Sequence, residues 1–130
     1  MKYLALLGRV FFSLIFILAA TFHFSQGAID YAMGQGVPMA NILVPISGVL
    51  AMMGGLSIAV GFKTKWGAWL IVLFLVPLTL MMHNFWAMSD PMMAQVAQAM
   101  FMKNLSMLGG ALYLTQVGSG PLSLDAWKKA

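Results

Sequence analysis

Ionisable side chains occur inside long apolar stretches of this sequence, where a charge is costly to bury: Arg9, His23, His83 and Lys103. An arginine or lysine there can offset the negative charge of a ligand, and a neutral imidazole can accept or release a proton near pH 7. The chain has no glutamate, and its three acidic residues lie between or beyond the apolar stretches. Four ways of accommodating the two cations remain: snorkelling to lipid phosphate, a neutral lysine bonded to carbonyl groups, a carboxylate from another subunit, or an electron-rich ligand.

Amide and aromatic side chains accompany two of these groups. Asn84 and Trp86 follow His83, and Asn104 follows Lys103. Amides can hydrogen-bond carbonyl oxygens, and an indole can stack on a ring. We therefore take as candidate cofactor-binding residues Arg9, His23, His83, Asn84, Trp86, Lys103 and Asn104. No metal site is predicted, and the absence of cysteine excludes disulfides, thiol catalysis and iron–sulfur ligation by this chain.

The composition indicates which elements must position these residues. Of 130 residues, 62% are hydrophobic and only 8% are charged, whereas a soluble domain carries about a quarter charged. A bilayer core of about 30 Å is crossed by about 20 apolar residues in a helix. The sequence predicts one all-α domain, an antiparallel four-helix membrane bundle with spans at residues 3–24, 39–61, 66–88 and 92–117 and a tail at residues 118–130.

The basic residues predict the orientation of the bundle. Six of them fall at the beginning of span one, between spans two and three, or at the end of the chain: Lys2, Arg9, Lys63, Lys65, Lys128 and Lys129. Because basic loops stay in the cytoplasm, both termini are predicted to be cytoplasmic. The net charge of +4 then reflects membrane orientation and not nucleic-acid binding. An alternative is a signal peptide cleaved near Ser25-Gln26-Gly27, which would leave three spans in the same orientation.

Helical spacing assigns faces to the spans. One row in span one is predicted to face the interior: Arg9, Ser13, Phe16, Ala20 and His23. The equivalent row in span three is Trp69, Val72, Val76, Thr79, His83 and Trp86. Small residues in span two, which let helices approach closely, are Ser47, Ala51, Gly55 and Ala59. Both histidines are predicted to lie at a similar depth in the outer half of the membrane, with His23 close to the outer surface and Lys103 near the midplane.

Several short motifs occur in a characteristic order: Gly8-Arg9, Gly54-Gly55, Gly61-Phe62-Lys63-Thr64, His83-Asn84-Phe85-Trp86 and Phe101-Met102-Lys103-Asn104-Leu105 before Gly109-Gly110. In this order the chain resembles the DoxX family. The resemblance implies a small four-span protein of the bacterial inner membrane, related to the membrane subunit of a thiosulfate–quinone oxidoreductase. It also implies an association with redox or oxidative-stress functions.

The first functional hypothesis is a quinone-interacting redox subunit or accessory protein. Arg9 and Lys103 would offset charge on the reduced quinone, and His83 would pass a proton toward His23. One alternative is a non-catalytic membrane anchor for soluble redox enzymes, in which Lys103 meets a partner's carboxylate and the tail docks proteins. Others are a small carrier of anions or weak acids, and a haem b site with His23 and His83 as axial ligands. Catalysis by this chain alone and association with a second copy are left open.

Overall fold

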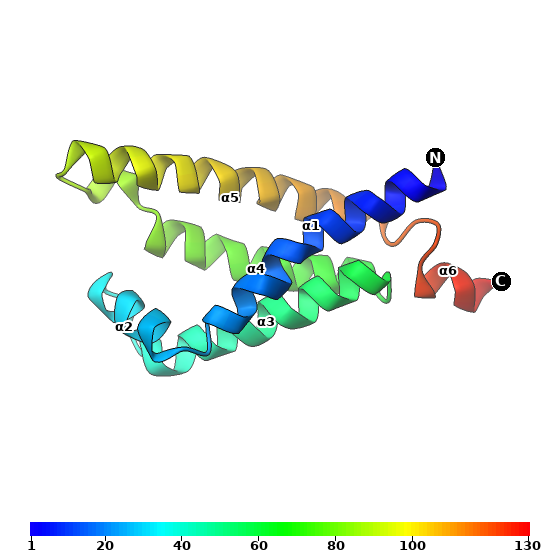
Figure 1. The fold of residues 1–130 in the computed structure, drawn as a ribbon, viewed down its shortest axis with the longest axis horizontal. Helices are drawn as coiled ribbons and strands as arrows, with labels where there is room; N and C mark the ends of the chain where they lie inside the picture. Colours follow the sequence, from blue (N-terminus) through cyan, green and yellow to red (C-terminus); the bar gives the residue numbers. More distant parts are fainter.

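The computed structural model describes residues 1–130 as an all-helical chain without strands. The helices are α1 (Lys2–Phe22), α2 (Gln26–Gly34), α3 (Ala40–Val60), α4 (Thr64–Met82), the 3-10 turn η1 (Phe85–Ala87), α5 (Pro91–Val117) and α6 (Leu124–Lys129). The four long helices run along the molecule, with α2 at one end and α6 at the other (Figure 1). The predicted all-α class is confirmed.

The long helices pack in chain order. Helix α1 contacts α3, α3 contacts α4, and α4 contacts α5, while α2 packs against α3. Helix α5 approaches α1 through the ring of Phe12, which lies against Gly110. The α4–α5 pair continues past the end of α4 through contacts between η1 and α5.

Glycines allow α3 to lie between α1 and α4. A Cβ on Gly55 would come within 2.8 Å of Ile17 on α1, and a Cβ on Gly54 would come within 2.8 Å of the Gly67 carbonyl oxygen on α4. The predicted row of small residues is buried at Ala51 and Gly55. Close approach through small side chains is how helices pack where lipid supplies little hydrophobic drive.

Local signals explain where the helices begin and end. Gly61 ends α3 in the left-handed conformation with φ 72°, which glycine adopts without penalty. Asp90 caps α5 by accepting a hydrogen bond from the Met92 N–H at 2.9 Å, with Pro91 at the first helical position. Ser25 caps α2 in the same manner. Helices α2 and α6 were not predicted, because each is short and α2 lacks a long apolar run.

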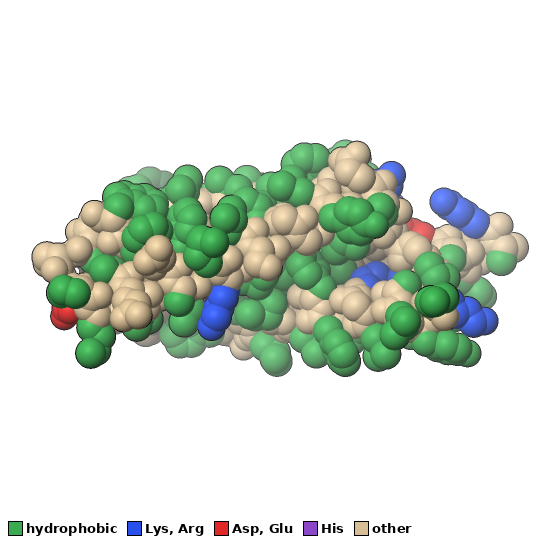
Figure 2. All heavy atoms as spheres, turned by 90° about the horizontal axis from the view of Figure 1, so that it is seen from above, with side chains coloured by type: hydrophobic (Ala, Val, Ile, Leu, Met, Phe, Trp, Pro, Cys, Tyr) green, Lys and Arg blue, Asp and Glu red, His purple; other side chains and the backbone are tan.

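Three segments are long and apolar enough to cross a membrane: Lys2–Phe22, Ala40–Val60 and Thr64–Ala87. Figure 2 shows hydrophobic side chains over most of the visible face. These features show a membrane protein. Helix α5 has 27 residues and begins within a residue of the predicted fourth span, but it is not among the three. Its exposed glutamines and Lys103 lower its hydropathy.

Candidate functional site

Arg9 is buried on α1, with 4% of its surface exposed. Its Nη2 donates to the Leu122 carbonyl at 2.7 Å, and its Nη1 donates to the carbonyls of Ser119 and, at 3.3 Å, Pro121. Its Nε donates to the Ala59 carbonyl at 3.4 Å. The cation is therefore satisfied by backbone oxygens of the C-terminal segment, a partner that the sequence analysis did not foresee because it treated this segment as an exposed tail.

Asp125 fixes the same segment to the turn between α3 and α4. Its Oδ2 accepts hydrogen bonds from the Lys63 N–H at 2.9 Å and from the Ser119 hydroxyl, and its N–H donates to the Gly61 carbonyl at 2.9 Å. The Ser119 hydroxyl bond and then the Lys63 N–H bond lower the pKa of Asp125 below its usual value. We call residues 118–129 the C-terminal clasp, and the end of the molecule that carries it the basic end.

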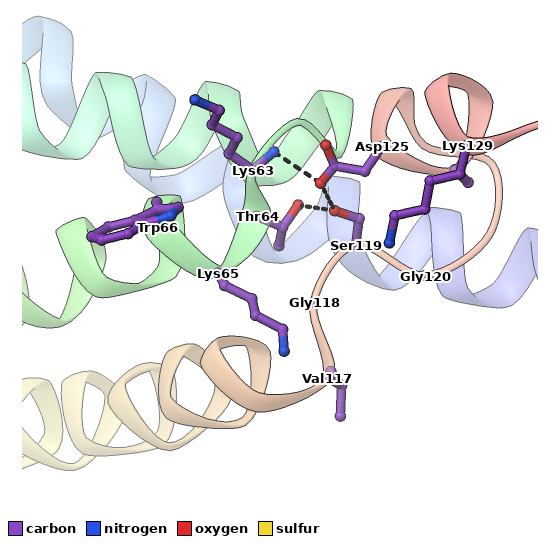
Figure 3. Close-up of a pocket in the computed structure, with 11 residues that line it drawn as sticks. Lys63, Thr64, Lys65, Trp66, Val117, Gly118, Ser119, Gly120, Asp125 and Lys129 are labelled. Carbon is purple, nitrogen blue, oxygen red and sulfur yellow. Dashed lines mark hydrogen bonds between the residues drawn. The ribbon is translucent and has the colours of Figure 1, made fainter.

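Two cavities lie beside the clasp. One of about 610 Å³ is lined by residues that include Lys65, Ser119, Asp125 and Lys129 (Figure 3). The other, of about 390 Å³, lies between α1 and α5 and includes Arg9 and Gly110 in its wall. Because the Arg9 guanidinium is held by carbonyls, the charged groups still free to meet a ligand here are lysines.

His23 lies far from this end. Its Nδ1 is 2.7 Å from the Ser47 hydroxyl, which itself donates to the Val44 carbonyl at 2.6 Å. A hydroxyl has one proton, so His23 Nδ1 donates to Ser47. A Cβ on Gly48 would lie 2.9 Å from the His23 Cβ, and Gly48 is about 12 Å along α3 from its first residue. His23 is therefore level with the second to third turn of α3, and α2 packs against α3.

The two histidines also lie at different depths. The His23 ring is 5.4 Å from the Phe74 ring, and His83 follows Phe74 by nine residues, about 13 Å along α4. The similar depth on which the haem alternative depended is not observed. The row predicted to face inward on α1 is confirmed for four of its members, which are buried: Arg9, Ser13, Phe16 and Ala20.

The predicted motifs of α4 and α5 do come together at the end opposite the clasp. The Phe101 ring lies 5.5 Å from the Phe85 ring and 5.8 Å from the Trp86 ring. His83 and Asn84 directly precede this cluster in the chain, and Asn104, three residues after Phe101, lies on the same side of α5. Lys103, two residues after Phe101, lies on the opposite side of that helix. His83 and Asn84 are half-buried, whereas Trp86 is 59% exposed. We call Phe85, Trp86 and Phe101 the aromatic cluster.

Lys103 lies near the middle of α5, about 18 Å from its first residue, Pro91, and about 21 Å from its last, Val117. Its side chain is exposed and not buried within the bundle. Asn104 is instead buried, and its Nδ2 has no hydrogen-bond partner.

The row predicted to face inward on α4 is also corrected. Trp69 is 49% exposed and Val76 is 39% exposed. Since α4 lies between α3 and α5, its buried residues occupy two flanks and not one stripe: Gly67, Ala68, Ile71, Phe74, Leu75 and Thr79.

The SURF4 family's model matches residues 1–130 of this chain. ER-derived vesicles protein ERV29 of Saccharomyces cerevisiae is 33% identical over 81 residues, which are 62% of this chain and 26% of the yeast protein. The Surfeit locus protein 4 homolog of Schizosaccharomyces pombe is 33% identical over 97 residues, 74% of this chain and 31% of that protein. Inner membrane protein YqjF of Escherichia coli is 31% identical over 122 residues, 92% of this chain and 88% of that protein.

The chain thus spans about a third or less of the length of the two fungal relatives. No solved structure matches it. The match over the whole chain overturns the resemblance to the DoxX family. Short glycine and aromatic motifs also serve helix packing and turns, as at Gly54 and Gly61, so their order did not separate one family of small helical membrane proteins from another. The chain belongs to the SURF4 family and is a membrane protein.

Proposed function

We propose that this protein is a non-catalytic membrane protein that binds a partner polypeptide through the exposed side of α5. The observation that carries the proposal is the exposed Lys103, which lies on a helix of the apolar assembly. No acidic residue of the chain lies near its level, because Asp90 precedes it by about 20 Å of helix and Asp125 belongs to the clasp. A cation at this depth is costly in lipid, so a partner's carboxylate would stabilise it.

The remainder of this helix side supports a protein partner. The buried residues of α5 face the rest of the molecule: Ala97, Asn104, Ala111 and Thr115. Exposed polar residues lie elsewhere around the helix: Gln95, Gln98, Lys103, Ser106 and Gln116. Polar side chains of this kind form interhelical hydrogen bonds when another helix covers them.

The depth of α5 follows from its neighbour α4. Phe101 lies beside Phe85 at one end, and the Lys65 side chain lies within 3.2 Å of where a Cβ on Gly118 would be at the other. Since α4 lies within an apolar segment long enough to cross a bilayer, we infer that α5 is the fourth span. This assignment gives an antiparallel four-helix bundle with both termini at the basic end.

The relatives and the charges support a proposal for the cellular setting. The basic end carries Lys63, Lys65 and the last two lysines, whereas Asp30 and Asp90 are outside it. The positive-inside rule then places the basic end in the cytoplasm. Inner membrane protein YqjF covers nearly the same length, which supports the bacterial inner membrane as the location.

A second copy of this chain does not supply the missing charge. A symmetric neighbour in the same membrane presents its residues at the same depths, and no acidic residue lies at the depth of Lys103. We therefore infer that the partner is a different membrane polypeptide with a carboxylate in its apolar segment. In the longer fungal relatives, additional chain is available for such a role.

Photo-crosslinking in native membranes tests this proposal. A photoreactive amino acid at Ser106, exposed on α5, is compared with one at Val49, exposed on α3. We expect an adduct from position 106 but not from position 49, and a loss of about fivefold or more in Lys103→Leu, as for a polar contact within the bilayer. The expected partner contains an acidic residue in a membrane segment. An adduct of twice the chain mass, equal labelling from both positions, or an unchanged yield in Lys103→Leu contradicts the proposal.

A quinone headgroup is a second candidate ligand, favoured by the unpaired Asn104 amide beside the aromatic cluster. His83 and Asn84 supply further polar groups there, and an amide N–H is a donor for a quinone carbonyl. Binding of a ubiquinone analogue to the purified protein, followed by quenching of tryptophan fluorescence, tests it. The candidate predicts weaker binding in Asn104→Leu and in His83→Ala. Unchanged binding in both variants rejects it, whereas Arg9 is not expected to take part.

A further inference from the structure

The larger cavity beside the clasp, of about 610 Å³, is flanked by two ammonium groups. Lys65, in the first turn of α4, and Lys129, at the end of α6, extend from two sides toward the loop formed by Gly118, Ser119 and Gly120 (Figure 3). The Lys63 side chain points away from this loop in the same view, although its backbone N–H holds Asp125. Two of the four lysines of the basic end, Lys65 and Lys129, therefore line the same cavity although they are far apart in the sequence.

The cavity keeps a positive charge. Asp125 is the one acidic residue in its wall. Its Oδ2 is already occupied by the Lys63 N–H and the Ser119 hydroxyl. One carboxylate does not neutralise two ammonium groups. The cavity therefore keeps a net positive charge, which attracts an anion.

The wall also includes two residues whose backbone N–H groups are free. Ser119 and Gly120 line the cavity, and their N–H groups donate to no protein acceptor. Gly118 and Gly120 have φ of 78° and 70°, which allows the chain to turn sharply between α5 and the clasp. Two free N–H groups next to two ammonium groups suit an oxygen-rich anion such as a phosphate.

The position of the cavity at the end of a membrane-spanning helix favours a lipid headgroup as the phosphate group that binds. The cavity lies where the apolar helix α4 begins, and Trp66 in its wall is 74% exposed. Exposed tryptophan at the end of a spanning helix is typical of the headgroup level of a bilayer. The exposed apolar surface of α4, including Trp69 and Leu73, offers acyl chains a place to lie. We propose that this cavity binds the phosphodiester of an anionic phospholipid between Lys65 and Lys129.

Native mass spectrometry of the full chain tests the proposal with two double variants of equal charge. The protein is incubated with equal amounts of phosphatidylglycerol and phosphatidylcholine that carry the same acyl chains, and the retained lipids are compared. Each lysine near an anionic headgroup contributes about fivefold to affinity. We expect the preference for phosphatidylglycerol to fall roughly twentyfold in Lys65→Gln/Lys129→Gln.

The matched control is Lys63→Gln/Lys128→Gln. It removes the same charge from the same turn and the same helix. Lys63 lines the cavity, but its side chain points away from the loop at Gly118 and Gly120 (Figure 3). Lys128 lies 4.4 Å above the Phe62 ring and is not in the cavity wall. We expect this control to keep the preference within about twofold. An equal loss in both double variants, or a loss in neither, overturns the proposal. Excess inorganic phosphate is the last arm: lysine-dependent phosphate binding without any preference for phosphatidylglycerol overturns the assignment to lipid. Circular dichroism confirms equal helical content.

Discussion

Replacing Arg9 with methionine should release the C-terminal clasp without unfolding the helices. The substitution keeps an unbranched apolar stem in place of the arginine stem but removes the guanidinium, which leaves the carbonyls of Leu122 and Ser119 without their donor. A hydrogen bond from a charged donor contributes about 1.5–3 kcal/mol, so these two short bonds contribute about 3–6 kcal/mol before the cost of desolvating the guanidinium. We expect a net loss of about 3 kcal/mol in the free energy that holds the clasp.

The clasp has little stability of its own. Helix α6 has six residues, whereas an isolated helix needs about 12–15 residues to persist in water. Its backbone bonds therefore depend on docking. A loss of about 3 kcal/mol corresponds to a roughly hundredfold larger equilibrium constant for opening of the clasp.

Hydrogen–deuterium exchange of the detergent-solubilised protein measures this effect. The amides to follow are Asp125, which donates to the Gly61 carbonyl, and Trp127, which donates to the Ser123 carbonyl. The matched control is Lys2→Met, which removes an exposed cation from the same helix. We expect both amides to exchange roughly a hundredfold faster in Arg9→Met and at the wild-type rate in the control. Wild-type exchange in Arg9→Met would show that Arg9 does not hold the clasp.

Further predictions concern the same contacts and the buried amide. Gly61→Ala should lower the free energy of unfolding by about 2 kcal/mol or more, because the residue has positive φ and the new Cβ would lie 2.2 Å from the Ser123 Cβ; an unchanged denaturation midpoint in detergent contradicts this. Asn104→Leu should raise the free energy of unfolding by about 1–2 kcal/mol in lipid-free protein, since it removes an unpaired buried donor; destabilisation would show that the amide has a partner. The pKa of Asp125 lies below its usual value of 3.8 in the folded chain, so its contribution to the clasp is complete above that pH and is lost as the pH falls through the lower folded value; exchange of the clasp amides should not change between pH 7 and pH 5, after correction for intrinsic rates. The purified protein should show no Soret band, because the two histidines lie at different depths.

Some of the helix limits and the row on α1 were predictable from the sequence because they depend on local rules. Helix α3 ends at Gly61 and α5 begins after its cap Asp90, whereas α4 ends at Met82, six residues before the predicted limit of its span at residue 88. The 3.6-residue period aligns Arg9 with Ser13 and Phe16 whatever the neighbouring helices are. The basic end followed from the positions of the lysines for the same reason.

The environments of Lys103 and Trp69 were not predictable in this way. Both depend on which helices are neighbours and how far each helix slides along the next. Periodicity identifies a face but not its partner, and α4, with neighbours on two sides, has no single inward stripe. The end of α1 at the level of Gly48 likewise depends on α2, whose nine residues gave no apolar run to recognise.

The position of Arg9 separates the functional hypotheses more sharply than any other residue. A quinone site that uses both Arg9 and Lys103 needs their side chains on one headgroup, but the Arg9 bonds lie beyond the end of α5 and Lys103 is about 21 Å before that end. Since a quinone headgroup is far smaller than this separation, one ligand cannot meet both cations. With α5 as the proposed fourth span, the cation left within the bilayer is Lys103, and an anionic group that meets it approaches α5 from the lipid side or from a partner. A membrane anchor or assembly partner meets this requirement, because a carboxylate of the partner polypeptide can approach Lys103 without any rearrangement of the helices. Crosslinking from α5 therefore discriminates best between partner binding and a redox role.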